Sequence, residues 1–251
     1  MLICFDIGNT NIVLGIVDNN NIKETYRFVT NANLTSDEYY QKVKGILENI
    51  TIDGVIISSV VPSLDMVFDL MIKKHYKVNP IFVGPGIKSG IKLKIENPKS
   101  LGADLLCDAV GAVNKYLAPV IVVDLGTATK FIVVNEKNEY LGGAIAPGMN
   151  GSLNSLIASA AKLSHTALVK PDNVIGNDTI TCIQSGMIYG TASMIDGMLD
   201  RIKEQLSIEN LKVVLTGGLS PLIKDCLKSQ VIFNQNILLE GLIYLYNRNL
   251  K

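Results

Sequence analysis

Two short polar segments carry the residue types and the spacing that bind a polyphosphate. Residues 6–11 (DIGNTN) follow the apolar run 2–5, and residues 124–129 (DLGTAT) follow the apolar run 120–123. Glycine lets the backbone approach phosphate oxygens closely, and nearby amide and hydroxyl groups donate hydrogen bonds to them. The sequence therefore predicts two phosphate-binding hairpins, with candidate donors at Gly8, Asn9, Thr10, Gly126, Thr127 and Thr129.

The aspartate–glycine segment after an apolar run occurs twice in the chain, and this repetition favours a nucleotide site. A single hairpin of this kind is explained as well by a tight turn. Two copies at equivalent places, each followed by a second apolar run and a turn, favour two hairpins that grip one triphosphate. Asp6 is then placed to hold magnesium, directly or through water, because Mg²⁺ prefers carboxylate, phosphate and water oxygens.

A third glycine turn and an isolated aspartate extend the set. Gly217 and Gly218 follow the apolar run 213–215. Backbone without side chains there would leave room for the adenine of a nucleotide. Close packing of a helix on a strand also selects paired glycines. Asp104 follows glycine at an apolar helix start, and phosphoryl transfer to an alcohol needs a base near the attacking hydroxyl. Its alternative role is a helix N-cap. Asp108, four residues later on the same helical face, is the reserve candidate.

The elements that position these residues alternate between strands and helices, which is typical of an α/β sheet. Alternating apolar runs predict the strands, and apolar residues at helical spacing predict the helices. Strands are expected over residues 2–5, 12–17, 22–29, 54–57, 120–123, 131–134, 139–145 and 213–215. Helices are expected over 37–49, from 62, over 104–116, from about 153, from 178 or 179 to about 206, and over 237–247. Residues 84–100 are expected to form an irregular loop.

The long helix expected to end near residue 206 is apolar along two stripes. One stripe includes Met187, Met194 and Met198, and the other includes Ile188 and Ile195. A helix that is apolar on two faces must be covered twice, once by its own sheet and once by something else. A second subunit is the simplest second cover, and burial within the chain is the alternative.

Composition excludes several classes of protein. Lys plus Arg (23) equals Asp plus Glu (23), so no net charge attracts nucleic acid or an anionic membrane. No basic leader precedes the first strand, and the apolar run 119–123 is far shorter than the ~20 residues that span a bilayer. We therefore expect a cytoplasmic protein without nucleic-acid or membrane partners. The P-loop and dinucleotide-binding glycine motifs are missing from the sequence, which excludes those nucleotide folds.

The cysteines do not form a metal-binding pattern. The four cysteines include no CxxC pair, and the chain has two histidines that could join them. This spacing disfavours a structural zinc site, and we expect free thiols in the core of a protein from a reducing compartment.

Six motifs in register resemble those of type III pantothenate kinases, a family of the actin-like superfamily that includes acetate and sugar kinases. The resemblance covers nearly the whole chain in order and spacing. It implies an α/β, duplicated actin-like (ribonuclease H-like) two-lobed fold with mixed sheets flanked by helices. The implied N-terminal lobe spans 1–117, and the C-terminal lobe with a dimerisation helix spans 118–251. The motifs are residues 6–11, 58–62, 102–104, 124–129, 142–148 and 216–218.

The resemblance also implies an activity. Type III pantothenate kinases use ATP to phosphorylate the primary hydroxyl of pantothenate to 4'-phosphopantothenate, the first committed step of coenzyme A synthesis. The implied ions are Mg²⁺ and an activating K⁺ or NH₄⁺, and the implied assembly is a homodimer with active sites at the subunit interface. Two alternatives remain: a kinase of the same fold for another small alcohol, and a catalytically weak nucleotide-binding regulator.

Individual roles follow from the same resemblance. Asp104 resembles the family's base, Asp6 its magnesium-associated acid, and Asp124 its ligand for the monovalent cation. Thr179 resembles a threonine that reaches the pantothenate pocket from the partner subunit, and it is equally well explained as a helix cap. The resemblance adds Asn11 and Ala128 to the phosphate-binding hairpins, and Gly102 and Ala103 to the substrate site.

One position departs from the family pattern. Relatives usually have arginine after the motif's aspartate, whereas this chain has Leu105. Replacing a charged hydrogen bond with apolar contact weakens binding by ~10-fold or more. We therefore expect weaker substrate binding at Leu105 unless Lys130 or Lys99 supplies the missing cation.

Overall fold

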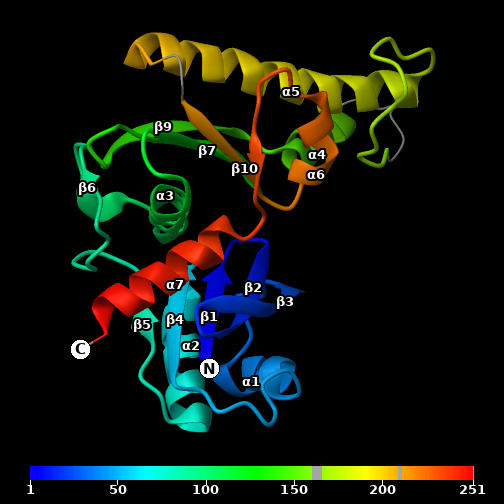
Figure 1. Ribbon diagram of the computed structural model, residues 1–251. Coiled ribbons are helices and arrows are strands. Elements are labelled where there is room, and N and C mark those ends of the chain that lie inside the picture. The colour runs from blue at the N-terminus through cyan, green and yellow to red at the C-terminus, as the bar shows by residue number, and fades with distance from the viewer. Residues whose placement is uncertain (160–165, 209–210, 251) are drawn as a thin grey trace. The chain divides into compact units, whose positions relative to one another are not determined.

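The computed structural model describes residues 1–159, 166–208 and 211–250 (Figure 1). The chain divides into two compact units. The first unit contains residues 1–117, residues 138–140 and the C-terminal residues from 236 onward. The second unit contains residues 118–137 and 141–235.

A five-stranded mixed sheet forms the centre of the first unit, in the order β3-β2-β1-β4-β5. The central strand β1 pairs antiparallel with β2 and parallel with β4. The outer pairs are antiparallel for β2 with β3 and parallel for β4 with β5. The strands are β1 (Leu2–Ile7), β2 (Asn11–Asp18), β3 (Asn21–Val29), β4 (Gly54–Ser59) and β5 (Ile81–Phe82).

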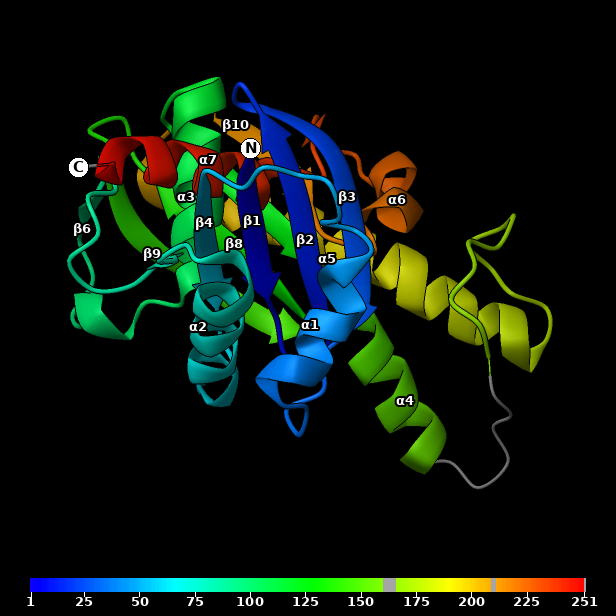
Figure 2. The ribbon, with the colours of Figure 1, turned by 90° about the horizontal axis from the view of Figure 1, so that it is seen from below.

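Alternation along β1 sends side chains to two different layers. Ile3, Phe5 and Ile7 join the buried core beneath α1 and α2, which lie on one face of the sheet (Figure 2). Side chains of the opposite parity, Cys4 and Asp6, point to the other face. Helices α3 and α7 pack on that face, against β4 and against β1 and β4 respectively. The helices are α1 (Ser36–Lys44), α2 (Pro62–Tyr76), α3 (Ala103–Tyr116) and α7 (Ile237–Asn249).

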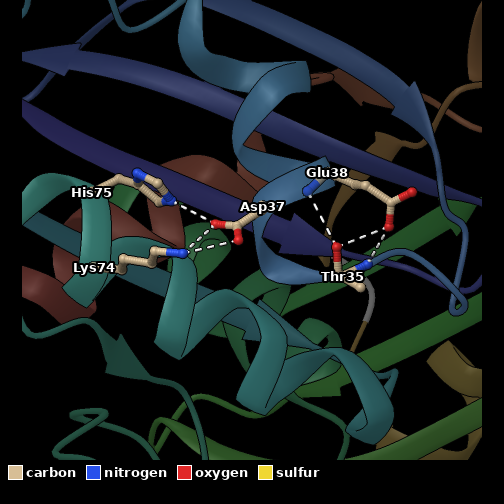
Figure 3. Close-up of polar contacts among 5 residues, drawn as sticks. All are labelled: Thr35, Asp37, Glu38, Lys74 and His75. Carbon is tan, nitrogen blue, oxygen red and sulfur yellow. Dashed lines mark hydrogen bonds and ion pairs between the residues drawn. The ribbon is translucent and has the colours of Figure 1, made fainter.

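Helix α1 begins with a capping box and is tied to α2 by an exposed ion pair (Figure 3). The Thr35 hydroxyl accepts from the Glu38 amide, and the Glu38 carboxylate accepts from the Thr35 amide. Lys74 Nζ lies 2.8 Å from Asp37 Oδ1, and His75 Nε2 lies 2.9 Å from the same oxygen. The helix ends five residues before the predicted end at 49, and its C-cap is Gly45, a poor helix former.

Helices α3 and α7 approach so closely that their backbones touch. A Cβ atom on Gly111 would lie 2.2 Å from the Ile237 carbonyl oxygen, and one on Gly241 would lie 2.0 Å from the Cys107 carbonyl oxygen. Glycine is required at both positions, because no other residue leaves room for the facing backbone. The helix that carries Asp104 is therefore fixed against the last helix of the chain.

The second sheet repeats the strand order of the first. Its order is β11-β10-β7-β8-β9-β6, so the central strand β7 again has an antiparallel neighbour on one side and parallel strands on the other. Strand β6 pairs with the first residues of β9, which belong to the first unit. The strands are β6 (Lys92–Leu93), β7 (Val120–Leu125), β8 (Ala128–Val134), β9 (Glu139–Pro147), β10 (Lys212–Thr216) and β11 (Ile232–Phe233).

The long helix α5 (Thr179–Leu206) ends at the predicted residue and packs on the second sheet. Ile188 and Ile195, from one predicted stripe, lie in the same core as Ile121 and Val123 of β7. Burial within the chain therefore accounts for that stripe. The smaller helices of this unit are α4 (Met149–Ser159) and α6 (Ser220–Ile223). Within the described ranges, no helix combines the length and apolar character needed to cross a membrane.

The predicted core thiols are only partly right. Cys4 and Cys107 are buried, whereas Cys182 on α5 is exposed and Cys226 is half-buried. Cys182 lies in the first turn of a helix that begins at the surface, so its position in an apolar helical pattern did not place it in the core.

Candidate functional site

The first glycine hairpin joins β1 to β2 and is closed by its own backbone. The Gly8 amide donates to the Asn11 carbonyl at 3.0 Å, and the Thr30 hydroxyl donates to the Gly8 carbonyl at 2.6 Å. Gly8 therefore shapes the turn, because its N–H is already used. Asn9 and Thr10 are exposed at the tip, so a phosphate would meet these two residues first.

The second glycine hairpin joins β7 to β8 and is built in the same way. The Gly126 amide donates to the Ala128 carbonyl at 3.1 Å, and Thr127 is exposed at the tip. Thr129 is 1% exposed, so of the two threonines only Thr127 is at the surface. Gly148 supports the turn from below, since a Cβ atom there would lie 2.3 Å from the Thr127 carbonyl oxygen.

Three carboxylates of the first unit surround one buried thiol. Burial raises the pKa of the Cys107 thiol well above its ordinary value, and the charges of Asp6, Asp108 and Asp104 raise it further. These aspartates come from the end of β1 and from the first two turns of α3. The structure thus brings Asp6 together with both predicted candidates for the base.

Asp104 and Asp108 differ in how they can be reached. Asp108 is 1% exposed, whereas Asp104 is partly exposed. The N-cap of α3 is Gly102, so Asp104 is the second helical residue and not the cap. Its Oδ1 atom accepts the Leu105 amide at 2.8 Å, which orients the carboxylate at the helix start. Asp104 is therefore the aspartate of this helix that a substrate hydroxyl can approach.

A cavity of about 190 Å³ lies beside the start of α3, within the first unit. Ala103 and Leu106 of the helix form part of its wall, on either side of Asp104 in sequence. The rest of the lining comes from residues of the segment 84–101, and Lys99 is the cationic side chain among the residues that line the cavity. The predicted irregular segment thus lines a largely apolar cavity next to the candidate base.

Asp124 of the second unit is paired with a lysine. It is the penultimate residue of β7 and lies directly opposite Lys130 of β8, and Lys130 Nζ lies 2.6 Å from Asp124 Oδ2. The two side chains are 12% and 15% exposed. Gly217 adopts φ +93°, and a Cβ atom there would lie 2.5 Å from Asp124 Oδ1. Gly217 is thus required both by its backbone conformation and by the carboxylate beside it.

The remaining predicted residues lie at the surface. Gly218 is exposed in the turn after β10, and Thr179 is the exposed first residue of α5. The cap of α5 is Asp178, whose side chain accepts the Thr181 amide at 2.9 Å. The alternative interpretation of Thr179 as the helix cap is therefore wrong.

Sequence reasoning included two hydroxyl residues in the six motifs but gave them no role beside Asp6 and Asp124. Ser58 of β4 lies opposite Asp6, and Thr216 of β10 lies opposite Asp124. Both are buried. The signal was present, because Ser58 is the penultimate residue of an apolar strand and Thr216 is the last residue of another. Only the sheet register shows which aspartate each of them faces.

The first unit offers a ligand suited to magnesium without a preformed cage. In the ranges that the structure describes, no three His, Cys, Asp or Glu side chains gather to hold a metal ion. Mg²⁺ in nucleotide enzymes needs only one or two carboxylates, since water and phosphates supply the other ligands. Asp6 is partly exposed at the end of β1 beside the exposed hairpin tip, and it fits this requirement.

Similarity to solved structures defines the class of protein. The chain matches the (R)-2-hydroxyglutaryl-CoA dehydratase component A of Acidaminococcus fermentans with a TM-score of 0.58 and 16% identity, covering 98% of this chain and 96% of the other. It matches a ROK family glucokinase from Streptomyces griseus, solved with glucose and AMPPNP, with a TM-score of 0.52 and 15% identity over 98% of both chains. The repeated sheet order and these likenesses confirm the duplicated fold of actin-like ATPases and sugar kinases.

Sequence similarity defines the family within that class. The model of the family described as type III pantothenate kinase matches residues 2–201. The type III pantothenate kinase of Geobacillus sp. (strain WCH70) is 40% identical over 254 residues, covering 99% of this chain and 98% of that protein. The chain belongs to the type III pantothenate kinase family, as its six motifs predicted.

Proposed function

We propose that this protein transfers the terminal phosphoryl group of ATP to the primary hydroxyl of pantothenate, the first step of coenzyme A synthesis. One observation carries the proposal. Asp6 and the partly exposed Asp104 both lie near the buried Cys107 thiol, in a chain of the type III pantothenate kinase family. One carboxylate suits the metal that accompanies ATP, and the other suits the attacking alcohol.

Asp104 is the proposed base. Its Oδ1 atom is held by the Leu105 amide, so the carboxylate is oriented before substrate arrives. In phosphoryl transfer a carboxylate orients the hydroxyl and accepts its proton as the bond to phosphorus forms. Asp108 has the same chemistry but lies buried, which leaves it a supporting role beneath Asp104.

The glycine hairpins and Asp6 are the proposed ATP site. The exposed tips offer Asn9, Thr10 and Thr127 to the phosphates, and Gly8 and Gly126 keep the turns tight. Asp6 would hold Mg²⁺, which neutralises phosphate charge when bound. The K⁺ or NH₄⁺ predicted at Asp124 has a competitor, since the Lys130 ammonium already contacts that carboxylate. The other proposed ATP-binding residues are Asn11, Ala128, Thr129, Gly217 and Gly218.

The cavity beside α3 is the proposed pantothenate pocket. Gly102, Ala103 and Leu105 surround Asp104 at the helix start, and the apolar wall suits the methyl groups of pantothenate. Pantothenate ends in a carboxylate, and Lys99 lines the cavity with an exposed ammonium group that can pair with it. Lys99 is thus proposed to supply the positive charge that relatives have as an arginine at the position of Leu105.

A homodimer is proposed on the basis of the surface around Thr179. Val174, Ile175 and Ile180 are large apolar side chains that are 64%, 87% and 47% exposed near the start of α5. Exposed apolar side chains that gather in this way mark protein contacts. The family resemblance implies that such a second copy receives Thr179 in its pantothenate pocket. We also propose that the enzyme is cytoplasmic, where ATP is available as its phosphoryl donor. We propose that its substrates are small molecules and not nucleic acids, because its basic and acidic residues balance.

A coupled assay of ADP release tests this function. We expect turnover that requires pantothenate and is not supported by glucose or other sugars. Asp104→Asn should lower kcat by about 10²- to 10⁴-fold while leaving the melting temperature nearly unchanged. Asp69→Asn removes the same charge from the surface pair with Lys73 on α2 and serves as the matched control. Equal or faster turnover with another alcohol would favour the same-fold alternative, and near-normal turnover of Asp104→Asn would remove the residue's role.

A further inference from the structure

The Asp124 carboxylate is enclosed by groups of its own chain. Lys130 Nζ lies 2.6 Å from Oδ2. The backbone of Gly217 comes so near Oδ1 that a Cβ atom there would lie 2.5 Å away, and a Cβ on Gly126 would lie 3.6 Å from Oδ2. Each carboxylate oxygen therefore has a neighbour: an ammonium on one side and glycine backbone on the other.

The strand register of the sheet places the Lys130 ammonium group beside Asp124. Asp124 and Lys130 are direct partners in the antiparallel register of β7 and β8, so their side chains leave the sheet on the same face. Both belong to the second unit, and each is largely sheltered from water, at 12% and 15% exposed. Salt in the solvent screens such a sheltered pair far less than it screens an exposed one.

A free monovalent cation does not fit beside this pair. K⁺ bound to Asp124 would lie within a few ångströms of the Lys130 ammonium, and like charges that close repel strongly. The ammonium group of lysine carries the same charge as K⁺ or NH₄⁺ and is a compact point charge with three hydrogen-bond donors. The residues around Asp124 thus disagree with a site for a diffusible monovalent ion.

We propose that the Lys130 ammonium is the built-in monovalent cation of this site, so that ATP binding and turnover need neither K⁺ nor NH₄⁺. The inference rests on the proposed kinase function. Asp124 stands directly before the hairpin of residues 126–129, the proposed phosphate site, and an uncompensated carboxylate there would repel a triphosphate. Lys130 neutralises that carboxylate permanently, because the ammonium is tethered to β8 and cannot diffuse away.

The test compares salts at one ionic strength. The wild-type protein should show less than about a twofold change in kcat between choline chloride, KCl and NH₄Cl, since no ion site is open. The dissociation constant of a non-hydrolysable ATP analogue, measured by calorimetry without pantothenate, should also be the same in all three salts. Stimulation of wild-type turnover or analogue binding by about tenfold or more in KCl overturns the proposal, and this arm needs no variant.

Lys130→Met should create the ion requirement that the wild type lacks. In choline chloride the variant should bind the ATP analogue about tenfold more weakly, or worse, because a charge-assisted contact is lost. KCl or NH₄Cl should restore part of that affinity and raise the melting temperature of the variant. Lys137→Met removes an exposed lysine from the turn after β8 and should show neither effect.

The two readouts separate this inference from the proposed function. If pantothenate supports no turnover but analogue binding is salt-independent in the wild type and rescued by K⁺ in Lys130→Met, the function is wrong and the inference stands. A folded Lys130→Met protein that binds the analogue normally in choline chloride overturns the inference and leaves the function intact.

Discussion

The two sheets carry the same row of side chains across their central strands, with one difference. In the first sheet, Ser58, Asp6 and Val13 lie side by side on β4, β1 and β2. In the second sheet, the equivalent row on β10, β7 and β8 is Thr216, Asp124 and Lys130. The duplicated fold thus repeats the hydroxyl residue and the aspartate, and it changes only the residue on the antiparallel neighbour.

That single difference assigns opposite tasks to two equivalent carboxylates. Asp6 faces a valine and shares its surroundings with Asp104 and Asp108, so this region is rich in negative charge and suits a cation from solution. Asp124 faces Lys130 and is already neutralised. We therefore propose that the repeated fold does not repeat an ion site, because the cross-strand partner of each aspartate differs.

The largest expected effect is the difference in stability between two variants that each lack the charge of one of these aspartates. Asp124→Asn leaves the sheltered Lys130 ammonium without its carboxylate and should lower the free energy of unfolding by about 3 kcal/mol. Asp6→Asn should cost less, because the residue opposite Asp6 on β2 is Val13 and not a lysine. Thermal melts at pH 7 compare the two variants. Equal losses of stability would show that the two rows do not differ in this way.

A second experiment makes the rows alike. Val13→Lys places an ammonium opposite Asp6, where it should copy the pair seen at Asp124 and compete with magnesium. We expect the apparent affinity for Mg²⁺, measured by titration in the presence of an ATP analogue, to fall about tenfold, equivalent to about 1.4 kcal/mol. Val13→Met has a similar length without the charge and should bind Mg²⁺ as the wild type does. An unchanged affinity in Val13→Lys would argue that Asp6 is not the magnesium ligand.

The smallest effect concerns an aspartate–lysine pair in water. Asp37 and Lys74 are 58% and 57% exposed, against 12% and 15% for Asp124 and Lys130. Hydrogen bonds from Lys74 and His75 hold the pKa of Asp37 below its ordinary value of 3.8. A lowered folded-state pKa adds stability above that ordinary value, and the contribution is lost as pH falls through the folded-state pKa. Exposure keeps it small.

Asp37→Asn measures this contribution. The variant should melt slightly below the wild type at pH 7, and the difference in melting temperature should shrink as the pH falls below 3.8, the ordinary pKa of the group. A gap that widens on acidification would contradict the direction of the pKa shift. A loss at pH 7 as large as that of Asp124→Asn would show that burial does not separate the two pairs.

Local signals in the sequence predicted most elements, and contacts between distant segments explain what they missed. The repeated apolar runs located β1, β2, β7 and β8, and the long apolar pattern located α5 to its last residue. The end of α1 was predicted too late, because apolar spacing continues past Gly45, the poor helix former at the C-cap of the helix. The spacing of apolar residues predicts which side chains are buried, but it does not predict the residue at which a helix ends.

The surroundings of the candidate site depend on pairings that no local pattern encodes. Asp6 and Cys107 are about a hundred residues apart, and only the packing of α3 on the first sheet brings them together. The partner of Asp124 was closer to prediction, since a short hairpin between two strands limits the register that places Lys130 opposite it. Lys130 was expected as a substitute for a missing arginine, whereas the strand register places it opposite Asp124.

The contact between α3 and α7 bears on how the chain can be made. A ribosome releases the first 117 residues long before it reaches α7, yet α7 supplies the surface against which Gly111 and Cys107 rest. The early segment must therefore wait, with one side of its sheet uncovered, until the final helix has been synthesised. Loss of a few C-terminal residues, or a bulky tag fused there, should impair the proposed reaction centre at the start of α3, which is encoded far upstream.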